Sequence, residues 1–466
     1  MQRSLLAAIL CIPLLMGCSD EQTQRSTTWL GGEIVNPKID HVLLFRNEEV
    51  IDTIPLQDNN FFLYKSQELE PGLYSFQHHE YQVLFLEPGD SLMLRVNTVD
   101  FDESLTFTGR GAAKNNLMIE MFLLNEQEDK LISNFYLLEP AAFEQKLDSL
   151  KEQRLLLLGS YMSKNEPSAR FESLIRANID YDFYARKELY VSAAAMNNLR
   201  RESDSIPGDF LAHRDSTDHE SCDIHAHYSY YRYLNRLFDN LSYEQYSQQS
   251  GFDRNSFRHN YLRMQLIDSL IEHEHLKNMM LRTNIGRYLL IANNKQQEQN
   301  MVDLFLTANT NEEHHQEIRR LAENAMKLTP SNTVPNVDLV GLDNTSRDLH
   351  SIIRRPTVLY FWSTESTNHH RNIHQRVSDL QSRYPAFEFV GINTGSDYGK
   401  WKKVIQQSGY SAGREFQCKD VKSAQESLMI GSINKAIIID AKGTIIEGNS
   451  NLFYQAIEDQ LASLSN

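Results

Sequence analysis

The chain has 466 residues, of which 41% are hydrophobic and 10% aromatic, and its formal net charge is −16 at pH 7. This composition excludes a wholly disordered protein, and the length is sufficient for several domains, each with its own core. The negative charge argues against a nucleic-acid partner, because phosphates would repel it and no Lys/Arg cluster with interleaved aromatic residues offsets the repulsion.

The first residues have the pattern of an export signal. Arg3 supplies a positive charge, and the apolar run Leu5–Leu15 is too short to span a membrane. The sequence Leu15-Met16-Gly17-Cys18 that follows resembles the lipobox of bacterial lipoproteins. This resemblance implies a signal peptide over residues 1–17, with Cys18 as the lipidated first residue of the mature protein.

Lipidation of Cys18 would make the membrane a partner of this protein, since several acyl chains give stable anchoring. Residues 18–27 are polar and fit a tether. Ser19 stands where enterobacterial lipoproteins of the inner membrane carry aspartate, and Ser19-Asp20-Glu21 resembles the export signal of Bacteroidetes surface lipoproteins. The implied location is the cell envelope, at the outer membrane, facing the periplasm or the surface.

Residues 28–109 have the alternating pattern of a small β-sandwich. Turn sequences such as Glu70-Pro71-Gly72 separate the predicted strands. These strands are Val42–Phe45, Phe61–Tyr64, Leu73–Phe76, Gln82–Leu86, Ser91–Val96 and Leu105–Thr108. The runs Leu86–Ser91 and Phe107–Asn115 are similar to the N-terminal β domain (DUF4369-like) that precedes a thioredoxin-like domain in many Bacteroidetes lipoproteins.

Residues 110–330 are predicted to be α-helical. Only four glycines and three prolines occur between Leu117 and Thr329, and apolar residues recur at helical spacing. A linker, Thr329–Pro335, follows this region.

Residues 335–466 alternate between predicted strands and helices, as expected of an α/β domain. The strands are Val358–Phe361, Phe387–Asn393, Lys435–Asp440 and Ile445–Glu447, and the helices are Asn372–Arg383, Tyr398–Ser408 and Leu452–Leu464. The predicted fold class is therefore a multidomain α+β protein with an N-terminal β-sandwich, a central α-helical domain and a C-terminal α/β domain.

The turn after the strand at Val358 resembles the active-site turn of TlpA-like thiol-disulfide oxidoreductases of the thioredoxin-like superfamily, F-W-A-x-W-C-x-x-C-R. Here the W-C-x-x-C positions read Glu365-Ser366-Thr367-Asn368-His369. Both cysteines are therefore replaced, by Ser366 and His369. The proline that faces the motif in the family corresponds to Asn434. Disulfide exchange requires an attacking thiolate and a resolving thiol, which serine and histidine cannot supply.

Other chemistry at this turn can be considered. Ser366 and His369 could form a nucleophilic pair, but the sequence offers neither an orienting acid nor an oxyanion hole. We expect instead that Ser366 or Thr367 caps a helix and that the histidines are solvated.

Histidines also raise the alternative of a metal site. His370 and His374, with His369 adjacent, could share one helical face, and the run His219–His227 is rich in ligand types. Neither group has a recognised ligand spacing, so the sequence assigns no metal and no cofactor.

Only Cys222 and Cys418 remain outside the leader and the lipobox. They can be two free thiols or an interdomain disulfide, and they cannot form a C-x-x-C pair. The leading hypothesis is a lipid-anchored envelope protein whose redox-inactive thioredoxin-like domain binds a protein or peptide. The alternatives are a TlpA-like oxidoreductase and a histidine-based metal-binding protein.

Overall fold

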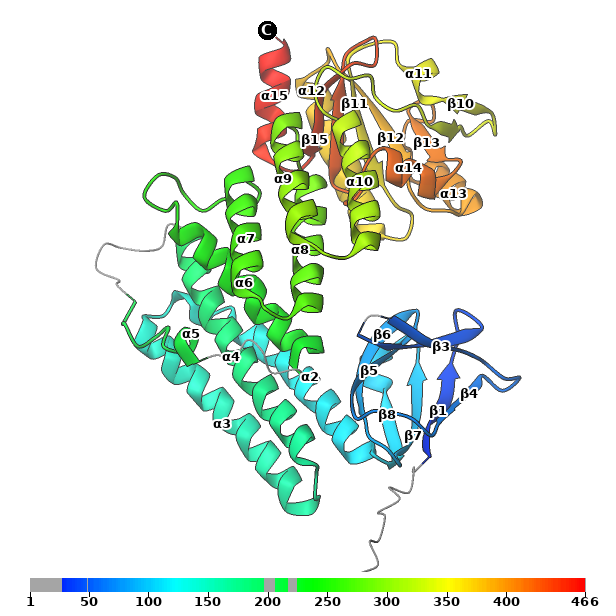
Figure 1. The fold of residues 1–466 in the computed structure, drawn as a ribbon. Coiled ribbons are helices and arrows are strands. Elements are labelled where there is room, and N and C mark those ends of the chain that lie inside the picture. The colour runs from blue at the N-terminus through cyan, green and yellow to red at the C-terminus, as the bar shows by residue number, and fades with distance from the viewer. Residues whose placement is uncertain (1–26, 48, 197–205, 217–223, 466) are drawn as a thin grey trace, which may run out of the picture. The chain divides into compact units, whose positions relative to one another are not determined.

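A computed structural model describes residues 27–47, 49–196, 206–216 and 224–465. It confirms the multidomain α+β class, with strands first, helices next and an α/β domain last (Figure 1). The chain forms two compact units, the first of residues 1–137 and 145–180 and the second of residues 138–144 and 181–466. Cys18 and Cys222 lie outside the described residues.

The β part of the first unit contains two four-stranded sheets, in the orders β4-β1-β7-β8 and β3-β2-β5-β6. Buried residues of both sheets, among them Leu30, Leu44, Phe76 and Leu92, form one core, so the sheets pack as a sandwich. The strands are β1 (Thr28–Val35), β2 (His41–Arg46), β3 (Glu49–Pro55), β4 (Phe61–Ser66), β5 (Gly72–His78), β6 (Glu80–Leu86), β7 (Ser91–Asn97) and β8 (Thr106–Arg110).

Helices follow the sandwich and complete the first unit. The short α1 (Phe101–Ser104) and the long α2 (Ala112–Ile132) contribute Phe101, Ala112 and Ile119 to the sandwich core. The next two helices, α3 (Pro140–Lys164) and α4 (Ala169–Met196), each extend into both units. Within the first unit, the buried Arg154 of α3 donates from Nε to Glu128 of α2 over 3.1 Å.

The second unit contains the remaining helices and the α/β domain. Its helices before the linker are α5 (His213–Ser216), α6 (Tyr228–Glu244), α7 (Phe257–Leu270), α8 (Glu274–Leu289), α9 (Lys295–Ala308) and α10 (Glu312–Lys327). Their amphipathic faces bury aromatic and aliphatic side chains such as Tyr230, Tyr233 and Leu237.

The α/β domain has a seven-stranded sheet in the order β10-β9-β13-β12-β11-β14-β15. The central β11 pairs in parallel with β12 and antiparallel with β14, and every residue of β11 is buried. The strands of this sheet are β9 (Asp338–Val340), β10 (Ser346–Asp348), β11 (Thr357–Trp362), β12 (Glu388–Asn393), β13 (Glu415–Cys418), β14 (Lys435–Ile439) and β15 (Ile445–Asn451). The helices of the α/β domain are α11 (Leu349–Ile352), α12 (Thr367–Arg383), α13 (Tyr398–Ser408), α14 (Val421–Ser427) and α15 (Gln455–Ser465).

The predicted linker is attached to the sheet by backbone hydrogen bonds. Ser331 donates to Ile445 over 2.8 Å, Ile445 donates to Asn332 over 2.7 Å, and Val334 donates to Gly443 over 2.9 Å. The segment therefore extends the hairpin of β14 and β15. None of the helices in the described residues combines the length and the apolar character needed to cross a lipid bilayer.

Candidate functional site: the turn after β11

The turn between β11 and α12 is fixed by its own backbone. Ser366 donates to the carbonyl of Ser363 over 3.3 Å, and His370 donates to the carbonyl of Ser366 over 3.0 Å, which starts the helix. Ser366 is the N-cap residue, but its hydroxyl makes no capping hydrogen bond. The side chain of Ser366, which the sequence resemblance aligns with the first cysteine, therefore does not cap the helix.

His369 and Asn434, which the sequence resemblance aligns with the second cysteine and the proline of TlpA-like proteins, contact each other. The ring Nε2 of His369 lies 2.8 Å from Oδ1 of Asn434. Because an amide oxygen only accepts, Nε2 carries the proton and Nδ1 is left without one. Nδ1 is buried and has no hydrogen-bond partner among the described residues. Burial lowers the pKa of His369, so the ring is neutral at pH 7.

The loop that carries Asn434 also connects to an exposed aromatic pair. Asn434 accepts from the backbone of Leu452 over 2.9 Å, and the neighbouring Phe453 lies 6.2 Å from the ring of His369, centroid to centroid. Phe453 and Tyr454 are 39% and 61% exposed. The predicted helix from Leu452 begins only at Gln455, because residues 452–454 form this turn instead. We call Phe453 and Tyr454 the aromatic rim.

Ser366 and His369 do not form a nucleophile and base. No hydrogen bond joins them in the described part of the chain, because Nδ1 of His369, the nitrogen that could accept the serine proton, has no partner there. A general base must lie within hydrogen-bond reach of the proton that it removes. The geometry therefore gives no support to serine catalysis at this turn.

The expectation that the histidines are solvated is wrong. His370 is 5% exposed, and its Nδ1 lies 3.1 Å from the hydroxyl of Tyr410. His374 stacks on the ring of Tyr410 at 3.5 Å and 2°. Both imidazole rings also contact Trp362 at the end of β11, His370 in a tilted arrangement at 5.8 Å and His374 edge-to-face at 4.9 Å between centroids.

The structure places a buried carboxylate beside these rings. Glu415 of β13 is 2% exposed, and it accepts hydrogen bonds from Tyr360 and, over 2.9 Å, from Nε1 of Trp362. His374 approaches the same carboxylate with Nε2 at 3.2 Å, while its Nδ1 donates to the carbonyl of His370 over 2.6 Å. A buried carboxylate is tolerated only when donors surround it, as they do here.

Two further features belong to this carboxylate. Burial and the charge of Glu415 raise the pKa of Tyr360 well above its usual value, so the tyrosine remains a hydrogen-bond donor. Gly391 of β12 provides the space, because a Cβ atom there would overlap the carboxylate of Glu415. Sequence reasoning missed this network because it did not predict β13.

The three histidines considered as metal ligands do not converge on one point. Nε2 of His369 binds Asn434, whereas Nδ1 of His370 binds Tyr410 and both nitrogens of His374 are engaged. No group of three or more His, Cys, Asp or Glu side chains suited to a metal ion occurs in the described ranges. Most of the other candidate run, His219–His227, lies outside those ranges.

Cys418 is buried in β13 and free, and burial raises the pKa of its thiol to about 12. A thiol in that environment is not a nucleophile at neutral pH. The alternative of a disulfide with Cys222 is not tested, because Cys222 lies outside the described residues.

The thioredoxin-like family Thioredoxin_8 matches residues 354–445, which include the turn, the Glu415 network and Asn434. No curated protein matches the chain. The similar solved structures include the thioredoxin domain of a thiol-disulfide oxidoreductase from Bacteroides vulgatus, with 19% identity, 28% of this chain and 98% of that chain covered, and a TM-score of 0.25.

Two more solved structures have comparable sequence identity, coverage and TM-score. A domain of a possible thiol-disulfide isomerase from Cytophaga hutchinsonii has 16% identity, with 29% of this chain and 92% of that chain covered and a TM-score of 0.26. A thiol:disulfide interchange protein from a Bacteroides species has 18% identity, with 29% of this chain and 93% of that chain covered and a TM-score of 0.25. The class defined by the family match is that of proteins with a C-terminal thioredoxin-like domain.

Proposed function

We propose that this protein is a lipid-anchored protein of the cell envelope whose thioredoxin-like domain binds a protein or peptide and does not exchange disulfides. The observation that supports it best is the hydrogen bond between His369 and Asn434. It joins the positions of the resolving cysteine and of the substrate-docking proline in TlpA-like proteins. A redox site needs both positions open to a substrate sulfur.

The buried state of Cys418 supports the same proposal, because the only described thiol is protonated and inaccessible at neutral pH. The aromatic rim supports the binding role. Exposed aromatic side chains beside polar groups are typical of the centres of protein interfaces. The lipid anchor at Cys18 and the relation of residues 28–109 to DUF4369-like domains rest on sequence resemblance.

Insulin reduction with dithiothreitol tests the redox half of the proposal. The full-length chain is expected to precipitate insulin no faster than dithiothreitol alone, because no thiolate is available at Ser366 or His369. Faster precipitation of insulin by the wild type, retained in the variants Cys418→Ser and Cys222→Ser, would instead favour a TlpA-like oxidoreductase with unrecognised chemistry.

Selection from a displayed peptide library tests the binding half. Peptides enriched on the wild-type protein are expected to lose about tenfold in affinity on Tyr454→Ala, as aromatic anchors of interfaces do. Leu464→Ala is the matched control, since Leu464 is a 43% exposed apolar residue on α15, outside the rim. Failure to enrich any peptide, or enriched peptides that bind Tyr454→Ala with unchanged affinity, would contradict the proposal.

A further inference from the structure

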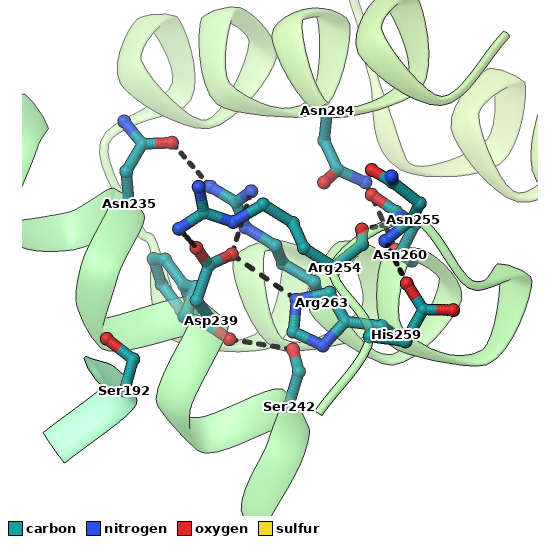
Figure 2. A network of polar contacts seen from close by, with 12 residues as sticks. Ser192, Asn235, Asp239, Ser242, Arg254, Asn255, His259, Asn260, Arg263 and Asn284 are labelled. Atoms are coloured by element: carbon teal, nitrogen blue, oxygen red, sulfur yellow. Dashed lines mark hydrogen bonds and ion pairs between the residues drawn. The ribbon is translucent and has the colours of Figure 1, made fainter. Parts of the chain in front are cut away.

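An arginine cluster lies among three helices of the second unit, outside the thioredoxin-like domain. Helix α7 packs against both α6 and α8. Arg263 belongs to α7, Arg287 to α8, and Arg254 to the loop before α7. Asp239 of α6 is the carboxylate that faces them, as Figure 2 shows for Arg254 and Arg263.

Asp239 is fully engaged within this cluster. Its Oδ1 lies 3.2 Å from Nη1 of Arg263 and 3.3 Å from Nε2 of His259, and its Oδ2 accepts from Arg254. Burial alone would raise the pKa of Asp239, but the hydrogen bond from His259 and the charge of Arg263 hold it below its usual value. Nδ1 of His259 lies 3.1 Å from the hydroxyl of Tyr246.

The positive charge exceeds what Asp239 can neutralise. The buried Arg263 and the half-buried Arg287 share this one carboxylate with the exposed Arg254, so positive charge is in excess in the cluster. Arg287 forms no ion pair within the described ranges, and its only hydrogen bond runs from Nη2 to Oδ1 of Asn260 over 3.4 Å. Burial and the charge of Arg263 lower the pKa of Arg287 to about 10. Burying like charges together is costly unless an anion accompanies them.

Two polar atoms of the cluster are also unused. Arg263 is 2% exposed, yet its Nε has no partner among the described residues. Asn284 is equally buried, and its Nδ2 donates to the carbonyl of Asn260 over 3.1 Å, which fixes the orientation of its amide. The Oδ1 of Asn284 therefore faces away from that carbonyl, and it has no partner in the described part of the chain. The cluster thus holds a spare donor and a spare acceptor.

We propose that Arg287, Arg263 and Asn284 form a binding site for inorganic phosphate. The excess positive charge of Arg263 and Arg287 attracts an anion. Guanidinium groups bind such oxyanions through paired, charge-assisted hydrogen bonds. The spare acceptor of Asn284 suits the O–H of hydrogen phosphate.

Isothermal titration calorimetry on the full-length protein tests this site, with sodium phosphate and glycerol 3-phosphate as probes at constant ionic strength. Saturable 1:1 binding of inorganic phosphate is expected. Arg287→Gln is expected to weaken it at least tenfold, because a charge-assisted pair is lost. The matched control is Arg282→Gln on the same helix, since Arg282 pairs with Glu317 over 2.7 Å. This control should retain wild-type affinity.

Glycerol 3-phosphate is expected to bind more weakly than inorganic phosphate, because the dianion of a monoester has no O–H for the acceptor of Asn284, and equal binding would overturn the role given to Asn284. The proposal is overturned if neither probe binds the wild type, or if Arg287→Gln binds phosphate as tightly as Arg282→Gln. Sulfate is the discriminating anion, because it has the same charge and no O–H. Sulfate binding as tight as that of phosphate would overturn the assignment to phosphate. Circular dichroism of each variant establishes that the helices are intact.

Discussion

Glu298 on α9 is a fully buried carboxyl group whose two oxygens have no hydrogen-bond partner among the described residues. Burial raises its pKa from 4.5 to about 7. The folded state therefore holds the proton more tightly than the unfolded chain does. The stabilising effect of this proton is complete below pH 4.5 and is lost as the pH rises towards 7.

Replacement of this carboxyl by an amide is expected to remove that pH dependence. At pH 8, Glu298→Gln should be more stable than the wild type by about 1–3 kcal/mol, because the wild type must bury an ionised group or take up a proton. At pH 4.5 the two proteins should unfold alike. Thermal unfolding at the two pH values measures the difference, with Glu313→Gln on the exposed surface of α10 as the control. A constant difference across this pH range would contradict the prediction.

At the scale of elements, the contact between His369 and Asn434 links the start of α12 to the loop before β14. A hydrogen bond of this type contributes about 1 kcal/mol to stability. The double-mutant cycle of His369→Ala and Asn434→Ala is therefore expected to give a coupling energy of about 1 kcal/mol.

Urea unfolding followed by tryptophan fluorescence measures this cycle in a Trp29→Phe background. The remaining tryptophans, Trp362 and Trp401, are both buried in the thioredoxin-like domain and report on it alone. His350→Ala is the control partner for Asn434→Ala, since His350 hydrogen bonds to the backbone of Val334 instead. Additive effects in the first cycle would show that the hydrogen bond between His369 and Asn434 does not stabilise the domain.

Much of the fold was predictable at this scale because periodic burial leaves a pattern in the sequence. The six strands predicted in the sandwich region and the helix Tyr398–Ser408 are present. Strand β1 was missed because Gly31 and Gly32 resemble a turn, although the absence of side chains there lets the neighbouring strands approach. Strand β3 was missed because almost all of it is exposed, and it therefore has no alternation.

The candidate site was predictable only in part. The positions of Ser366, His369 and Asn434 follow from the motif, but the contact between His369 and Asn434 joins residues that are distant in the chain. Strand β13 is a buried strand of four residues with the sequence Glu-Phe-Gln-Cys, whose polar residues indicate a surface loop. Its Glu415 accepts hydrogen bonds from Tyr360 and Trp362 of β11, and no local pattern reveals such partners.

At the scale of the whole molecule, the proposed anchor at Cys18 determines where the protein resides. In a bacterial host that processes lipoproteins, the wild type is expected to incorporate an alkyne-labelled fatty acid and to sediment with membranes. Cys18→Ser should lose both properties, because no acyl chain holds the polar tether to the bilayer. Cys222→Ser is the control and should keep them. Membrane association of Cys18→Ser equal to that of the wild type would contradict the proposed anchor.

The backbone hydrogen bonds of residues 331–334 to the hairpin of β14 and β15 determine how the chain can be divided. By sequence, Pro335 is the natural place to separate a thioredoxin-like cassette from the helices before it. A cassette cut there would lose the partner of Ile445 and expose unpaired backbone at the sheet edge, which invites association between copies. A segment that carries the thioredoxin-like domain into another protein, by engineering or by recombination between genes, must therefore begin before Ser331.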